Sequence, residues 1–141
     1  MNMKKLLIIV LIIVGVIGNI TAQQTNNTNK REKKKNMVVK EWNLKAGSST
    51  PFLDNVVTFD AMGRKIEEIE YASYGQKYRI VYEYEGNNTK CSQEIEYNDK
   101  NKPVTIKKFE YNADGTKAKQ YTYLPNGKLK NTKIYERIYR E

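Results

Sequence analysis

Two pairs of glutamates are the residues whose spacing could support acid–base chemistry. The members of each pair stand two residues apart, and the pairs are Glu68 with Glu70 and Glu94 with Glu96. On an extended strand such residues project from one face, and two close carboxylates can serve as the acid and base of glycoside hydrolysis. The same positions suit ion pairs with basic residues of neighbouring strands, namely Arg79, Lys90 and Lys108. We favour ion pairing and predict no catalytic residue. A carbohydrate-active enzyme using these carboxylates is the alternative.

The chain has no histidine and a single cysteine, Cys91. The usual general base, the usual zinc ligand and every Ser-His or Cys-His nucleophile are therefore absent. One cysteine also leaves no internal disulfide. The turns at 98–101 and 112–115 each offer one carboxylate, whereas calcium needs six or more oxygen ligands. We predict a non-enzymatic protein with no metal and no cofactor.

A repeat with an aromatic residue organises the second half of the chain. The aromatic recurs every 12 to 14 residues, at Phe59, Tyr71, Tyr84, Tyr97, Tyr111, Tyr123 and Tyr135. Four residues after each of the first six stands a glycine or asparagine, the residues that most readily accept a left-handed backbone. These are Gly63, Gly75, Asn88, Asn101, Gly115 and Gly127. Six aligned copies indicate one structural unit per repeat.

Each copy of the repeat predicts a strand followed by a tight turn. An apolar residue stands two positions before each of the first six aromatics, which is the period-two alternation of a strand. The residues after the aromatic, such as 112–115 and 124–127, have the composition of tight turns. The sequence therefore predicts an all-β fold, an antiparallel β-meander of six to eight strands in a single twisted or curled sheet.

The repeat resembles two known repeat families. The segment Phe59–Arg64 (FDAMGR) resembles the core of the YD repeats of Rhs-type proteins, and 111–116 is a looser copy. The segment Tyr123–Lys128 (YLPNGK) resembles the repeat of YwqK-like and MORN-like proteins. The similarity covers residues 59–135. It implies a β-strand repeat scaffold with surface or envelope binding, and it implies no catalytic residue.

The tyrosines are the residues with the best binding potential. Tyrosine combines a flat apolar ring with a hydroxyl group, which suits sugar stacking, peptide binding and protein interfaces. We expect one aromatic face made by Tyr78, Tyr82, Tyr84, Tyr97, Tyr111, Tyr121 and Tyr123. A bulge between Ile106 and Phe109, or a turn of different length before that strand, would preserve this face. Because a one-layer sheet needs a cover, we expect this face to form a core, to self-associate or to bind a partner.

The N-terminal region predicts export. Lys4 and Lys5 precede 13 apolar or glycine residues at 6–18, which is typical of a signal peptide rather than a membrane span. We predict a signal peptide at 1–22, with an uncleaved membrane anchor as the alternative. Residues 23–36 contain no apolar side chain and predict a disordered basic linker. Residues 37–141 are the predicted β-repeat domain.

The net charge of +9 belongs mainly to the N-terminal region. Residues 51–141 contain 16 Lys and Arg against 14 Asp and Glu, a net charge of +2. The folded part therefore predicts no specific nucleic-acid binding, and the linker offers an auxiliary anionic contact at Lys33, Lys34 and Lys35. We expect an exported binding or structural module of a bacterial envelope, in the periplasm, on the outer surface or secreted. Its partner would be a protein or glycan, and an inhibitor or immunity-type protein is another alternative.

Overall fold

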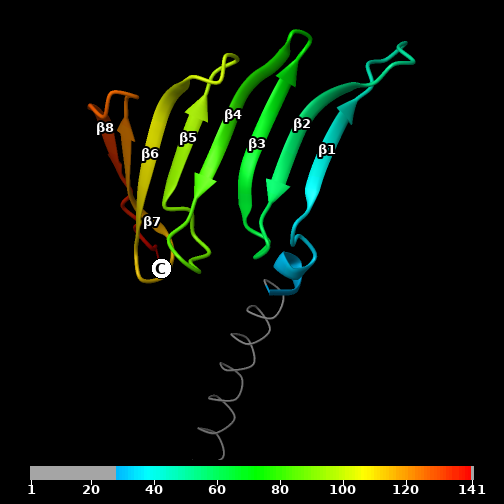
Figure 1. Cartoon of the computed structure of the whole chain (residues 1–141). Coiled ribbons are helices and arrows are strands. Elements are labelled where there is room, and N and C mark those ends of the chain that lie inside the picture. Colours follow the sequence, from blue (N-terminus) through cyan, green and yellow to red (C-terminus); the bar gives the residue numbers. More distant parts are fainter. Residues whose placement is uncertain (1–27, 141) are drawn as a thin grey trace, which may run out of the picture.

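Eight antiparallel strands form one open sheet in the computed structural model, which describes residues 28–140 (Figure 1). Each strand pairs with its neighbours in sequence, so the sheet order is β1 to β8 without a crossover. The strands are β1 (Val38–Asn43), β2 (Phe52–Phe59), β3 (Lys65–Ala72), β4 (Gly75–Glu83), β5 (Gln93–Tyr97), β6 (Pro103–Tyr111), β7 (Lys117–Tyr123) and β8 (Leu129–Ile134). The predicted all-β meander is confirmed.

Four turns of the sheet share one backbone geometry. They span 60–64, 98–102, 112–116 and 124–128, and in each the first N–H donates to the fifth carbonyl while the fourth N–H donates to the first carbonyl. The fourth residue has a positive φ in every case: 69° at Gly63, 55° at Asn101, 79° at Gly115 and 82° at Gly127. This left-handed position explains why the repeat allows only glycine or asparagine there.

The other two copies of the repeat make different connections. Ala72 pairs with Gly75, so only Ser73 and Tyr74 link β3 to β4. A long loop at 84–92 links β4 to β5, and its left-handed residue is Gly86 (φ 52°) rather than Asn88. The predicted four-residue turn is therefore wrong at these two places, where an abundance of polar and small residues permits more than one connection.

A β-bulge or similar irregularity interrupts nearly every ladder close to the repeat aromatic. Only the β4–β5 ladder is regular throughout the described sheet. In the β5–β6 ladder Glu96 pairs with Thr105 and Tyr97 with Pro103, so Val104 is the extra residue. The expected bulge in this strand is therefore present, but it lies at the start of β6 rather than between Ile106 and Phe109. Such an extra residue increases the local twist of the strand.

The sheet has almost no buried core. No side chain of residues 28–140 is fully buried, and only Phe109, Gln120 and Thr122 are more than about nine-tenths buried. Instead, cationic side chains lie over aromatic rings at eight places, from 3.8 Å for Lys117 over Phe109 to 6.0 Å for Lys77 over Tyr78. Proteins have about one such contact per 70–80 residues, so this density is unusual. The aliphatic stems of Lys and Arg therefore provide much of the cover that a second layer would give.

The segment before β1 packs against the turn between β2 and β3. Residues 28–32 form a helical turn and residues 33–36 a further turn. The N–H of Asn36 donates to the Asp60 carbonyl (2.9 Å), and Lys34 Nζ lies 4.8 Å from the centre of the Phe59 ring. Residues 28–36 thus contact the β2–β3 turn, and the disordered linker at 23–36 stays a prediction. The contact with Phe59 gives them the apolar partner that their own sequence lacks.

The predicted signal peptide at 1–22 lies outside the described residues. Within residues 28–140, no helix has the length and apolar character needed to cross a membrane.

Candidate functional site: the two faces of the sheet

The seven candidate tyrosines lie on both faces of the sheet. We call the face with Glu68 and Tyr82 face A, and the opposite face, with Arg79 and Tyr97, face B. Because directly paired residues share a face, the register assigns Tyr78, Tyr82, Tyr84 and Tyr111 to face A and Tyr97, Tyr121 and Tyr123 to face B. The prediction of a single aromatic face is wrong.

The repeat aromatics change face at each step from Tyr84 to Tyr97, Tyr111 and Tyr123. The step from Tyr97 to Tyr111 shows how. Ile95 and Tyr97 share face B, and Ile95 pairs with Ile106, which therefore also belongs to face B. Tyr111 is five residues after Ile106 in the same strand, and an odd separation places it on the opposite face. The bulge at Val104 does not correct this, because it precedes Ile106.

Glu68 is the centre of a cluster on face A. Its Oε2 accepts hydrogen bonds from Lys65 Nζ (2.7 Å) and from the Tyr82 hydroxyl (2.8 Å). Lys65 Nζ also lies 4.4 Å from the centre of the Tyr82 ring. The hydrogen bond from Lys65 lowers the pKa of Glu68, whereas burial, with the hydrogen bond to Glu68, raises the pKa of Tyr82. Glu68 is thus held as a carboxylate and is unsuited to be a general acid at neutral pH.

Glu70 repeats this arrangement next to Glu68 on the same face. Lys77 Nζ lies 2.6 Å from its Oε1, and this hydrogen bond lowers the pKa of Glu70. A hydrogen bond to Glu70 raises the pKa of Tyr78 to about 12. The predicted cross-strand ion pairing is therefore confirmed for Glu70, although its partner is Lys77.

Glu94 also pairs across strands, with a partner that differs from the expected ones, whereas Glu96 has no ion pair in residues 28–140. Glu94 lies 3.9 Å from Lys107 Nζ on face A. Arg79 donates to Glu67 on face B (3.0 Å) and lies 4.2 Å from the centre of the Tyr97 ring. Lysine, arginine and glutamate side chains thus link adjacent strands on both faces.

The turn residues Asp60 and Arg64 join two loops at one end of the sheet. Asp60 accepts hydrogen bonds from the Met62 N–H (2.8 Å), the Arg64 N–H (2.9 Å) and Arg64 Nε (2.8 Å). Burial alone would raise the pKa of Asp60, but the hydrogen bonds from Arg64 and Met62 lower it overall. Arg64 Nη1 donates to the carbonyls of Gly86 (2.8 Å) and Asn88 (3.0 Å). The aspartate and arginine of FDAMGR therefore have a structural role that the sequence reasoning missed, although their spacing of four is visible in the chain.

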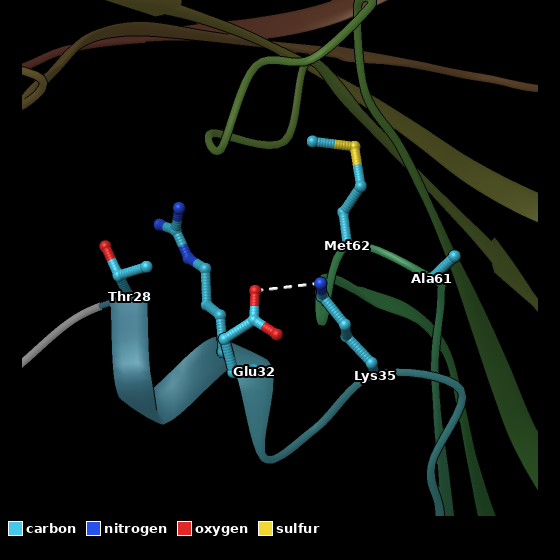
Figure 2. Close-up of a pocket in the computed structure, with 6 residues that line it drawn as sticks. Thr28, Glu32, Lys35, Ala61 and Met62 are labelled. Carbon is cyan, nitrogen blue, oxygen red and sulfur yellow. Dashed lines mark ion pairs between the residues drawn. The ribbon is translucent and has the colours of Figure 1, made fainter.

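The three lysines of the predicted anionic contact have different environments. Lys35 Nζ forms an ion pair with Glu32 (2.8 Å), and Lys34 lies over Phe59, whereas Lys33 is exposed. Figure 2 shows the small pocket beside them, of about 200 Å³, between the helical turn and the β2–β3 turn. Its lining residues are Thr28, Arg31, Glu32, Lys35, Ala61 and Met62. Lys33 and Lys35 are thus exposed, whereas Lys34 is partly buried.

An acidic pocket of about 340 Å³ lies beside the first strand. It is lined by Glu41, Asp54, Asn55, Glu68 and Glu70. Asp54 is the unpaired residue at the β1–β2 bulge, where Glu41 pairs with Asn55 and Trp42 with Leu53. In residues 28–140, no three acidic or cysteine side chains are grouped closely enough to hold a metal ion. The sequence reasoning missed this pocket because Glu41 and Asp54 precede the recognisable repeats.

Cys91 is a half-buried thiol that donates to the Gln93 carbonyl (2.9 Å). Burial raises the pKa of the Cys91 thiol, so the nucleophilic thiolate is disfavoured. Its own carbonyl accepts a hydrogen bond from the Tyr111 hydroxyl (2.7 Å). The contact from Tyr111 joins the end of the 84–92 loop to β6.

No protein-family model matches the chain, and no curated protein matches it. Among solved structures, the chain is similar to a TarM mutant from S. aureus, crystallised with Fondaparinux, alpha-GlcNAc-glycerol and UDP. The superposition has a TM-score of 0.29 and 15% sequence identity, and it covers 79% of this chain and 22% of that chain. A similarity this low carries no argument about function. The resemblance to YD and MORN-like repeats stays a prediction.

Proposed function

We propose that this protein is a non-enzymatic binding or structural module, exported to a bacterial envelope, that acts through the surface of a one-layer sheet. The observation that carries the proposal is the exposure of the sheet: no described residue forms a second layer, and only three side chains are buried. A protein that keeps both faces of a sheet near solvent has an extended surface for a protein or glycan partner.

The state of the carboxylates favours a binding module over an enzyme. Glycoside hydrolysis needs one carboxyl group that stays protonated near neutral pH. Glu68 and Glu70 are instead hydrogen-bonded by Lys65 and Lys77, which lower the pKa of each carboxyl. Both residues stabilise the sheet rather than being available for proton transfer.

A paired substitution on the two faces tests which of them binds the partner. Tyr82→Ser changes face A, and Tyr121→Ser changes face B, so a cross-linked pull-down from the envelope fraction should lose its partner with one variant. Thermal melts of each variant separate a loss of folding from a loss of binding. Replacement of the three linker lysines by Gln (Lys33, Lys34 and Lys35) should reduce partner binding only at low salt, because exposed charges are screened within about 10 Å at 0.1 M. Retention of the partner by both tyrosine variants would contradict a binding role for the tyrosines.

Export is tested on the protein recovered from the envelope. The intact mass should correspond to a chain that begins near Gln23 or Gln24. Recovery of the chain with Met1 in the membrane pellet would favour the anchor, and recovery only from the cytosol would contradict export.

A further inference from the structure

Exposed apolar side chains gather at the two edges of the sheet. Eleven large hydrophobic residues of the described chain are exposed, and eight of them lie on or just after β1 and β8. On the first edge these are Val38, Trp42 and Leu44, and on the second they are Leu129, Ile134, Tyr135, Ile138 and Tyr139. Exposure is 58% for Trp42 and rises to 83% for Tyr139. Such concentration of apolar surface at two places marks them as contact sites.

Both edge strands also leave backbone hydrogen-bonding groups without a strand partner. No described strand pairs with the outer side of β1 or of β8, which are the two ends of the sheet order (Figure 1). An open edge is a template for another strand unless proline, bulges or charges block it. Neither strand contains proline, and each has six residues. The bulge of β8 is confined to Lys130 near its start, so Asn131–Ile134 form a regular edge.

The charges of the two edges are complementary on face A. β8 carries Lys133 on this face, and the acidic pocket with Glu41 lies beside β1 on the same face. Pairing of β8 with another β8 would bring lysines near lysines, which is unfavourable. Pairing of β8 with β1 of a second copy brings Lys133 next to the acidic pocket.

The even number of strands lets this contact continue the sheet. In a meander of eight strands β1 and β8 run in opposite directions, so a second copy placed alongside sets its β1 antiparallel to β8. Face A then continues as face A, because Val39 and Glu41 share that face with Asn131 and Lys133. Full overlap of the two strands puts Val38 opposite Ile134, with Glu41 diagonal to Lys133.

We infer that this protein binds a second copy of itself head to tail, with β8 of one copy pairing with β1 of the next. The contact is heterologous, so it repeats and generates either a closed ring or an open filament. The inference rests on the proposed function, because it names a second copy as the partner of a structural module. The site of self-association is then the two sheet edges and not the tyrosine faces.

Cysteine cross-linking of the full chain tests the contact directly. In a Cys91→Ser background, Val38→Cys and Ile134→Cys are prepared separately and treated with a short thiol cross-linker. We expect no dimer from either variant alone, a dimer from their mixture, and a ladder of multimers from the double variant. Tyr74→Cys, which is 71% exposed in the β3–β4 turn, is the control for random collisions. A dimer of either single variant, or no dimer in the mixture above this control, overturns the inference.

Charge reversal provides a second measurement that does not depend on cysteine. Lys133→Glu should weaken self-association several-fold in sedimentation experiments, and Glu41→Lys in the same chain should restore part of it. Circular dichroism checks that both variants fold. Unchanged association in the lysine variant overturns the inference. The pull-down of an envelope partner is scored separately, so a monomeric protein that still binds its partner rejects the edge contact and leaves the proposed function standing.

Discussion

Lys65 illustrates how a single side chain substitutes for a missing layer. Its Nζ pairs with Glu68, and the same side chain lies over the ring of Tyr82. The cation, the carboxylate and the hydroxyl satisfy one another, while the aliphatic stem and the ring remove apolar surface from water. Arg79 does the same on face B with Glu67 and Tyr97. At the residue scale, stability therefore depends on charged groups more than in a protein with an apolar core.

Glu68→Gln should destabilise the fold by about 1 kcal/mol at neutral pH, because a charge-assisted hydrogen bond and an ion pair are lost at a partly exposed site. Glu96→Gln is the matched control, since Glu96 lies on the same face and has no ion pair among the described residues. Chemical denaturation of both variants measures the free energy of unfolding. An equal effect of the two changes would contradict a special role for Glu68.

The same pair of variants should differ in pH dependence. The pKa of Glu68 is lowered in the folded state, so its contribution is present above the ordinary carboxyl pKa of about 4.3 and is lost as the pH falls through the lower folded value. The stability difference between wild type and Glu68→Gln should therefore shrink in acid. Denaturation curves at neutral pH and below pH 4 measure this change, and a constant difference would contradict the assignment.

Tyrosine ionisation should occur late in the folded protein. The hydrogen bond between Tyr78 and Glu70 raises the pKa of Tyr78 to about 12, and burial raises the pKa of Tyr84 to about 12. Because the pKa of each tyrosine is raised in the folded state, each contributes to the stability of the fold below its ordinary pKa near 10. This contribution is lost as the pH rises toward 12. Ultraviolet absorbance of tyrosinate should show a late step that disappears in denaturant and shrinks in Tyr78→Phe. A single transition near pH 10 in the folded protein would contradict it.

The turns determine the geometry at the scale of the elements. The repeat of an aromatic, three residues and a glycine or asparagine predicted where strands end, because the left-handed residue is a strictly local requirement. It could not predict the face of each tyrosine, because one extra residue at a bulge reverses every later side chain in a strand. It also could not show which lysine covers which ring, since those contacts join neighbouring strands. The contacts of Asp60 and Arg64 were only partly predictable from the sequence. The hydrogen bonds between the two residues are local, whereas those from Arg64 to Gly86 and Asn88 join distant loops.

Two glycine substitutions should separate backbone strain from packing. Gly127 has a φ of 82° and open space around it, so Gly127→Ala should cost about 1 kcal/mol from the left-handed backbone alone. Gly63 has a φ of 69°, and a Cβ there would collide with the carbonyl of Arg31. Gly63→Ala should therefore cost at least about 1 kcal/mol more and should release residues 28–36. Thermal unfolding measures both costs, and proteolysis at Lys33 measures the release. Equal losses with no new cleavage would contradict the contact.

At the scale of the whole molecule, protection should fall from the centre toward both edges. The buried residues Phe109, Gln120 and Thr122 lie on β6 and β7, whereas β8 is exposed along its length and β1 along most of it. In dilute protein, amides of β1 and β8 should exchange with deuterium at least about tenfold faster than those of β6. At high concentration both edge strands should gain protection through the proposed contact. Uniform exchange across the sheet would contradict this gradient.

Because each strand pairs only with its neighbours in sequence, the sheet can fold one hairpin at a time. Every strand contacts only the strands before and after it in sequence, so no long loop has to close before a favourable contact forms. Folding can begin at any hairpin and spread in both directions, as in solenoid repeats. Gain or loss of two adjacent repeats would change the length of the sheet while conserving strand direction at both ends. A duplication of this kind is a simple route by which such a gene can grow.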